Sequence, residues 1–183
     1  QYSRSEAWSL EEGIVKSGSF NIDAGVGVRA VSGEKTAFAY SDDISLSALT
    51  DAASTVRAIA AAGQQRRQRV GTLKERRSAH SPAHSLYLPH DPLISLGAAD
   101  KVRLLERLES FARAEDTRVQ QVMAHLAGEY EVVLVAGSDG RLAADVRPLV
   151  RVSITVVVED DGRREQGSAG GGGRTEYGFF TDE

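Results

Sequence analysis

The sequence predicts an α+β fold in which a mainly antiparallel sheet carries two main helices packed on one face. Two observations support this prediction. Apolar and polar residues alternate in residues 1–40 and again in residues 119–159, but apolar residues recur every three or four positions in two segments between them. The connections between candidate strands are too short for crossover helices, so neighbouring strands should pair antiparallel.

The first forty residues are expected to form short strands at 7–10, 13–16, 25–31 and 36–40. Glycines separate these runs, where turns require a positive φ that glycine adopts without steric cost. The glycines concerned are Gly13, Gly18 and Gly33.

A first helix is expected at 49–60, because its apolar residues fall on one helical face. Ser45 or Ser47 can cap its start, and Gly63 can end it. The face is rich in alanine, so a neighbouring element, the sheet, should approach it closely. Its residues are Leu49, Ala52, Ala53, Val56, Ile59 and Ala60.

Residues 63–95 show neither period and predict a long irregular connection that is mobile around residues 63–78. A second helix follows, with Ser95 or Asp100 as its cap. Glu109 and Arg113 stand four residues apart on it with the acid first, which is the favourable order. Its expected buried face consists of Val102, Leu105, Leu108, Phe111 and Ala112.

The last third returns to strands. Residues 119–126 alternate up to Gly128, residues 130–136 are almost continuously apolar, and residues 151–159 form the strongest strand pattern. Pro148 lacks an N–H group and therefore marks an edge, a bulge or a strand start. Tight turns are expected at Asp139–Gly140 and Asp161–Gly162.

Length and composition limit the function. The length of 183 residues suits a single domain, or at most two small ones. The net charge of -4 argues against non-specific electrostatic binding to nucleic acid or to an anionic membrane. The absence of cysteine excludes disulfides, thiolate metal sites and a cysteine nucleophile. No apolar run approaches the roughly 18 residues of a membrane span.

Two sets of residues could carry chemistry in the connection. His80 and His84 have the spacing of a helical zinc pair, but Pro82 lies between them and no Glu adjoins the first histidine. His125 belongs to a strand pattern and is expected to be satisfied or solvent-facing. A basic loop could contact phosphate, although no aromatic residue is interleaved for base stacking, and a solvated loop is the alternative. The loop contains Arg66, Arg67, Arg69, Lys74, Arg76 and Arg77.

The most unusual local feature is the run Gly170, Gly171, Gly172 and Gly173 followed by Arg174. Consecutive glycines allow a ligand to approach the backbone closely, or they form a flexible hinge. The run does not match a phosphate-binding loop, because no Lys-Ser or Lys-Thr pair follows it. Both interpretations stay open, and no catalytic constellation can be selected from the residues alone.

Several motifs are similar to one family. They are Trp8–Glu11, Asn21–Ala30, Lys35–Tyr40, Ala143–Arg151, and the glycine run with Arg174, Tyr177 and Phe179–Phe180. Together they resemble the TldD/PmbA family of metallopeptidases, also labelled modulators of DNA gyrase, and the TldD branch more than the PmbA (TldE) branch. The resemblance covers almost all 183 residues apart from the segment 63–78.

The resemblance implies a cytoplasmic zinc metallopeptidase that acts on unfolded peptides as a heterodimer with a PmbA/TldE-like subunit. The family's zinc signature is His-Glu-x-x-x-His, and none of the four histidines here is followed by Glu. We therefore expect residues 1–183 to be the amino-terminal domain of a longer chain. This part would be inactive alone, would hold no catalytic residue or zinc ligand, and would have no membrane partner.

The expected role of such a domain is to contribute to the substrate cleft and to subunit contacts. A β-rich domain can hold an extended peptide by adding it to a free strand edge. The residues Gly170–Arg174 would then lie close to the substrate. The alternative is a free-standing binding or regulatory module, of gyrase-modulator type, that uses the basic loop 66–77, although nucleic acid is an unlikely partner.

Overall fold

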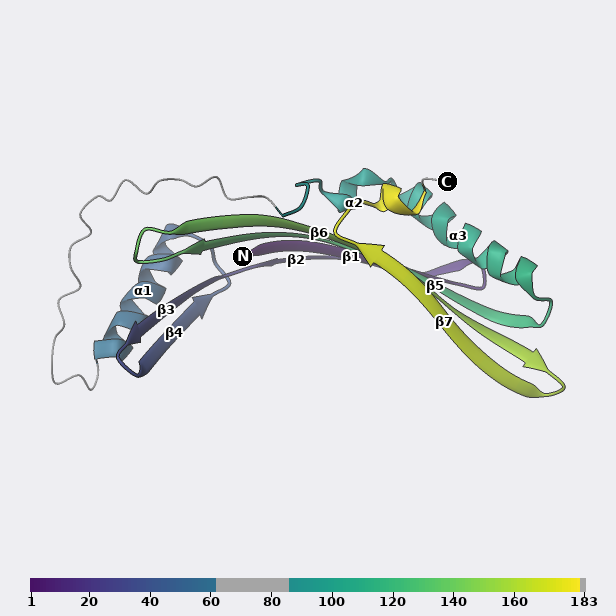
Figure 1. Cartoon of the computed structure of the whole chain (residues 1–183), viewed down its shortest axis with the longest axis horizontal. Helices are drawn as coiled ribbons and strands as arrows, with labels where there is room; N and C mark the ends of the chain where they lie inside the picture. Colours follow the sequence, from purple (N-terminus) through teal and green to yellow (C-terminus); the bar gives the residue numbers. More distant parts are fainter. Residues whose placement is uncertain (62–85, 182–183) are drawn as a thin grey trace. The chain divides into compact units, whose positions relative to one another are not determined.

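The computed structural model describes residues 1–61 and 86–181 (Figure 1). It confirms the α+β class with antiparallel strands and two main helices. The elements are β1 (Tyr2–Glu11), β2 (Ile14–Ala24), β3 (Val26–Ser32), β4 (Lys35–Ser41), α1 (Leu46–Ala61), α2 (Pro92–Ser95), α3 (Ala98–Glu115), β5 (Val119–Ala136), β6 (Leu142–Asp160), β7 (Arg163–Gly173) and the 3-10 helix η1 (Tyr177–Phe180).

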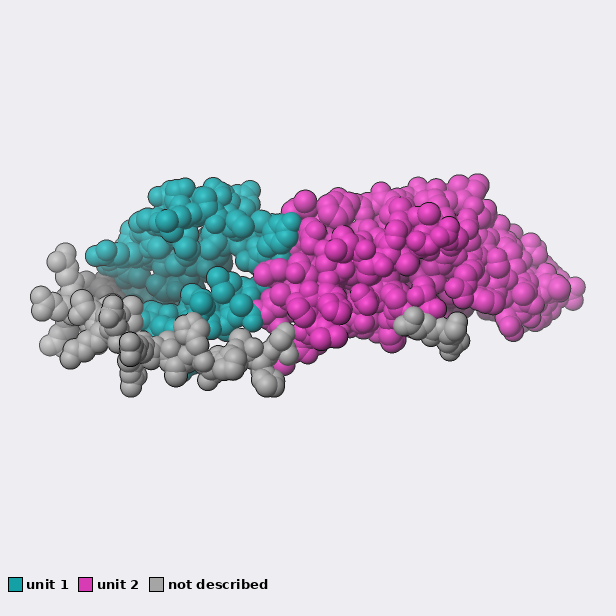
Figure 2. All heavy atoms as spheres, turned by 90° about the horizontal axis from the view of Figure 1, so that it is seen from above, with its two compact units in different colours: residues 1–2, 23–83, 133–144 teal, residues 3–22, 84–132, 145–183 magenta. Residues whose placement is uncertain are grey.

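The strands form a five-stranded sheet in the order β2-β1-β5-β6-β7 and a two-stranded sheet of β3 and β4. The β3–β4 and β6–β7 pairs are antiparallel. Contacts divide the chain into two compact units, one built around residues 23–83 and the other around residues 84–132 and 145–183 (Figure 2). Strands β5 and β6 run through both units, and the single domain expected from length stays a prediction.

In the first unit, α1 packs against both strands of the two-stranded sheet. Ala37, Ala52 and Val56 are buried there, which confirms that the helix meets a sheet, but Leu49, Ala53 and Ile59 of the expected face are exposed. The helix begins after Ser45, whose Oγ accepts a hydrogen bond from the backbone N–H of Ala48. The expected end at Gly63 lies outside the described residues.

In the second unit, α2, α3 and η1 lie on one side of the five-stranded sheet (Figure 1). The side chains between them form the main core, in which Leu105, Leu126 and Tyr177 are fully buried. This core joins α3 and η1 to β1, β5 and β6. Its buried members are Leu10, Leu104, Leu105, Ala124, Leu126, Val150 and Tyr177.

The prediction that strands end at Gly18 and Gly128 is wrong. Gly18 lies inside β2, and a Cβ there would be 3.4 Å from the Trp8 ring. Gly128 lies inside β5, where a Cβ would collide with the Tyr177 hydroxyl. Gly128 therefore makes room for an aromatic side chain, a Cβ on Gly18 would only contact one, and the turn at Gly33 has the positive φ that was expected.

The turns at Asp139–Gly140 and Asp161–Gly162 are confirmed by positive φ angles at Gly140 and Gly162. Pro148 lies within β6, in the part that β7 does not pair, since the β6–β7 register begins at Val150. Pro148 is therefore neither at a strand start nor on an edge strand, because β6 lies between β5 and β7 in the sheet.

The predicted start and buried face of the second helix need correction. Its N-cap is Gly97, because the unexpected short helix α2 occupies Ser95, whose hydroxyl donates to the Pro92 carbonyl. The buried face of α3 includes Lys101 and Glu109, while Phe111 is 61% exposed. Leu105 and Leu108 of the expected face do lie in or against the core, and the polar residues Lys101 and Glu109 are buried beside them.

Residues 62–85 lie outside the described residues. They include most of the irregular connection and several predicted sites, about which the structure says nothing. These residues are His80, His84 and the basic loop Arg66, Arg67, Arg69, Lys74, Arg76 and Arg77.

An ion cluster joins the end of α3 to the far end of β6. Arg118 binds Asp116 at 2.7 Å and Asp160 at 2.9 Å. The hydrogen bond from the Arg118 side chain, followed by one from its backbone N–H, lowers the pKa of Asp116 from 3.8 to about 2. Because the folded-state pKa is depressed, this contribution to stability is present above pH 3.8 and is lost as pH falls towards 2.

Replacing Arg118 with Gln should raise the pKa of Asp116 towards its ordinary value without fully restoring it, because the backbone hydrogen bond remains. Carboxyl-carbon NMR titration measures this shift. Arg163→Gln in the neighbouring hairpin is the control and should leave the Asp116 titration unchanged. An unaltered Asp116 pKa in Arg118→Gln would contradict the assignment.

Candidate functional site

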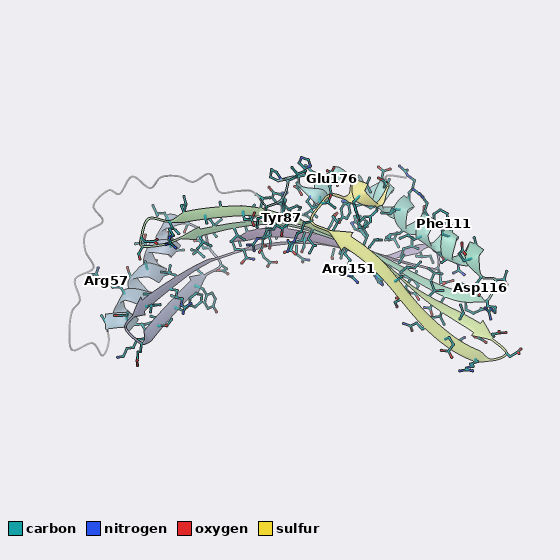
Figure 3. All side chains as sticks on the ribbon, in the orientation of Figure 1. Arg57, Tyr87, Phe111, Asp116, Arg151 and Glu176 are labelled. Atoms are coloured by element: carbon teal, nitrogen blue, oxygen red, sulfur yellow. The ribbon has the colours of Figure 1, made fainter. Side chains whose placement is uncertain are left out.

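The candidate site is the face of the five-stranded sheet that points away from α3, here called the helix-free face. Successive side chains of a strand point to opposite faces. Val150 is buried in the core under α3, so Leu149 and Arg151 point to the helix-free face. Figure 3 shows Arg151 on the side of the sheet away from the helices.

A hollow of about 320 Å³ opens on this face. Four strands contribute to it, and half of the lining residues are serine, alanine or glycine, which leaves the space unfilled between longer neighbours. The lining residues are Ser5, Glu6 and Ala7 of β1, Ser19 and Asn21 of β2, Ala127, Gly128 and Glu129 of β5, and Leu149 and Arg151 of β6.

Two charged side chains line the hollow without a partner. Within residues 1–61 and 86–181, neither Arg151 nor Glu129 takes part in a hydrogen bond or an ion pair. Hydroxyl groups elsewhere on the sheet are paired across strands, as in Thr155 with Ser168 at 2.9 Å. The guanidinium of Arg151 and the carboxylate of Glu129 are therefore charged groups of this face that remain available to a ligand.

The glycine run lies in β7 rather than in a linker, so the hinge interpretation is wrong. Gly170 pairs with Ser153, and Gly172 pairs with Arg151. A Cβ on Gly170 or Gly172 would collide with carbonyl oxygens of β6, whereas a Cβ on Gly171 would meet nothing within 4 Å. Close packing of β7 on β6 explains two of the glycines, and nearness to a substrate stays a prediction for the run.

Strand β7 is also the last strand of its sheet. One side of its backbone pairs with β6, and the other side pairs with no strand of the described part of the chain. Residues 168–173 of this edge carry only serine, alanine and glycine side chains. The edge thus presents bare backbone donors and acceptors. Arg174 follows directly, with its guanidinium 5.5 Å from the centre of the Tyr87 ring.

A buried polar network supports the opposite side of the hollow. The Lys101 ammonium lies 2.5 Å from the Glu6 carboxylate and donates to the Leu93 carbonyl at 2.8 Å. It also lies 5.0 Å from the centre of the Tyr177 ring. Burial, and then the charge of Glu6, raise the pKa of Tyr177. The network fixes α3 and η1 to β1 beside the hollow.

Sequence reasoning did not select Glu6, Lys101, Glu129 or Arg151 as site residues. A signal existed for Lys101, which precedes Leu104 and Leu105 by three and four residues and so shares their helical face. Arg151 is the single charge that opens the strongest strand pattern. His125, which was expected to be satisfied or solvent-facing, is exposed in β5.

A metal centre does not fit these residues. Across residues 1–61 and 86–181 there is no group of three or more His, Asp or Glu side chains that could hold a metal ion. None of the described helices is long and apolar enough to cross a membrane.

Comparison with known proteins identifies the family. Residues 1–61 match the PmbA/TldA metallopeptidase domain 1, and residues 91–183 match the PmbA/TldA metallopeptidase central domain. The chain belongs to the PmbA/TldD metallopeptidase family. It is 50% identical over 182 residues to a metalloprotease TldD homolog of Haemophilus influenzae, and 43% identical over 175 residues to one of Buchnera aphidicola. The two matches include 98% and 96% of this chain, but only 36% and 35% of the length of the two relatives.

Solved structures of PmbA/TldD relatives share the fold. A protein of Bacteroides thetaiotaomicron described as a modulator of DNA gyrase matches with a TM-score of 0.69 and 12% identity. TldE from Thermococcus kodakarensis matches with a TM-score of 0.66 and 16% identity. The matches cover 94% and 95% of this chain and 39% of each relative. At these identities the likeness concerns the fold alone.

Proposed function

We propose that this chain is a non-catalytic, peptide-holding part of a TldD-like zinc metallopeptidase. The observation that carries the proposal is the bare edge of β7 at residues 168–173, which adjoins the helix-free face. The family membership and the similarity to metalloprotease TldD homologs support the peptidase setting.

The edge of β7 is suited to strand addition. An extended peptide that pairs with β7 would satisfy the outward N–H and C=O groups of residues 168–173. Recognition through the backbone tolerates many sequences, which suits an enzyme that acts on unfolded chains. The small side chains of the edge leave room on both faces for the side chains of the peptide.

We propose that bond cleavage is carried by residues outside this chain, since none of its four histidines is followed by Glu. The chain spans 36% of its Haemophilus influenzae relative, so we propose that it belongs to a longer cytoplasmic polypeptide that pairs with a PmbA/TldE-like subunit. The purified chain should neither bind zinc stoichiometrically nor hydrolyse casein. Hydrolysis that a chelator stops would contradict this assignment.

Strand addition can be tested with prolines on the edge strand. Consecutive N–H groups of a strand point to opposite sides, so one of Ser168 and Ala169 donates towards β6 and the other towards the free edge. Of the variants Ser168→Pro and Ala169→Pro, the one that loses the outward donor should keep its melting temperature. That same variant should bind an extended peptide several-fold more weakly.

The probe is a fluorescein-labelled, acetylated and amidated ten-residue peptide rich in Ser, Thr and Val, measured by fluorescence anisotropy. The matched controls are Ser168→Ala and Ala169→Ser, which keep the backbone donors and should bind like the unmodified chain. Unchanged affinity in both proline variants would overturn strand addition at β7.

A further inference from the structure

The neighbourhood of Arg151 suggests which peptides the edge of β7 would favour. Arg151 lies directly opposite Gly172, and the next residue of β6 on the same face, Ser153, lies opposite Gly170. Because both partners are glycines, no side chain of β7 lies beside Arg151 or Ser153 in these pairs. We propose that Arg151 selects extended peptides that carry an internal Asp or Glu side chain. This inference rests on strand addition at β7.

The distances suit such a contact. Neighbouring strands lie about 4.8 Å apart, so a peptide added to β7 would lie about 10 Å from the β6 backbone. An extended arginine and an acidic side chain on the same face, reaching towards each other over glycine, together span this gap. Because the peptide would run past Gly172 rather than end there, the expected carboxylate belongs to a side chain and not to the chain terminus.

The charges favour an acid over other groups. Arg151 is exposed and makes no ion pair or hydrogen bond with any residue of the two described ranges. A guanidinium offers a planar pair of donors that matches a carboxylate. Glu129 lies on β5, on the side of β6 away from β7, so its negative charge repels an acid inside the hollow more strongly than one on the β7 side.

The test uses amidated ten-residue peptides that differ only at a central position, which is Glu, Gln or Lys. The unmodified chain should bind the Glu peptide about three- to fivefold more tightly than the Gln peptide, as expected for an exposed charge pair. Arg151→Gln should remove this preference, so that the Glu and Gln peptides bind with equal affinity. Arg151→Lys should keep part of the preference, since it retains the charge but loses the planar fork.

Two further variants serve as controls. Arg107→Gln makes the same charge change on α3, which covers the other face of the sheet, and should keep the full preference. Glu129→Gln should increase the preference for the Glu peptide, because it removes a repulsive charge from the hollow. The preference should shrink as salt is raised.

The outcomes separate the two proposals. Binding of all three peptides with equal affinity, or a Glu preference that survives Arg151→Gln, would overturn the role of Arg151 and leave strand addition standing. A dependence on Arg151 that appears only with non-amidated peptides would also overturn it, in favour of chain-end recognition. The absence of any peptide binding would overturn both proposals.

Discussion

Replacing Lys101 with methionine should lower the free energy of unfolding by about 3–5 kcal/mol, the range for breaking a buried ion pair. The Lys101 and Glu6 side chains are only 4% and 8% exposed. Without Lys101, the Glu6 carboxylate stays buried with no counter-charge, and the Leu93 carbonyl loses the donor that holds α2 to α3. Urea denaturation followed by circular dichroism measures the loss.

The double variant Glu6→Gln with Lys101→Met is the decisive control. Removing both charges leaves no isolated buried ion, so the double variant should recover much of the stability that Lys101→Met loses. Lys16→Met on the exposed strand β2 is the matched lysine control and should change stability by less than about 0.5 kcal/mol. Equal losses in the single and the double variants would show that Lys101 acts through packing alone.

The same network shows what a sequence pattern can and cannot predict. The period of 3.6 places the second helix correctly, because apolar residues must face a core. It identifies only part of the buried face, since Leu105 is buried as expected but Lys101 and Glu109 are also buried, by partners far away in the chain. Glu109 accepts hydrogen bonds from the Gly13 backbone N–H at 2.7 Å and from Arg113 at 3.0 Å. Of these, only the Arg113 pair is local enough to be predicted.

The glycines also fall into two groups, those explained by neighbouring residues and those explained by contacts with distant residues. Gly33 and Gly162 have positive φ angles in tight turns, a property that depends on neighbouring residues and was predicted. Gly128 makes room for Tyr177, which the sequence alone does not bring near it. The candidate site also depends on residues that are distant in the sequence, because its proposed selectivity arises from the strand register that places Arg151 opposite Gly172.

A single methyl group should distinguish two adjacent glycines of β7. Gly172→Ala should lower the free energy of unfolding by about 1–3 kcal/mol, the usual cost of overpacking, because its Cβ would collide with the Val150 carbonyl oxygen. Gly171→Ala should be neutral or stabilise by up to about 1 kcal/mol, since its Cβ meets nothing and alanine restricts the unfolded chain. Thermal unfolding of both variants measures the difference.

The pair also bears on why the run is glycine. If Gly171→Ala keeps both stability and peptide affinity, packing against β6 is sufficient to explain Gly172, and the bare edge tolerates a methyl group. If Gly171→Ala keeps stability but loses peptide affinity, the open space beside Gly171 is required by the bound peptide, as strand addition with close backbone approach predicts. Equal melting temperatures for Gly171→Ala and Gly172→Ala would contradict the packing of β7 on β6, on which the position of Arg151 beside the edge depends.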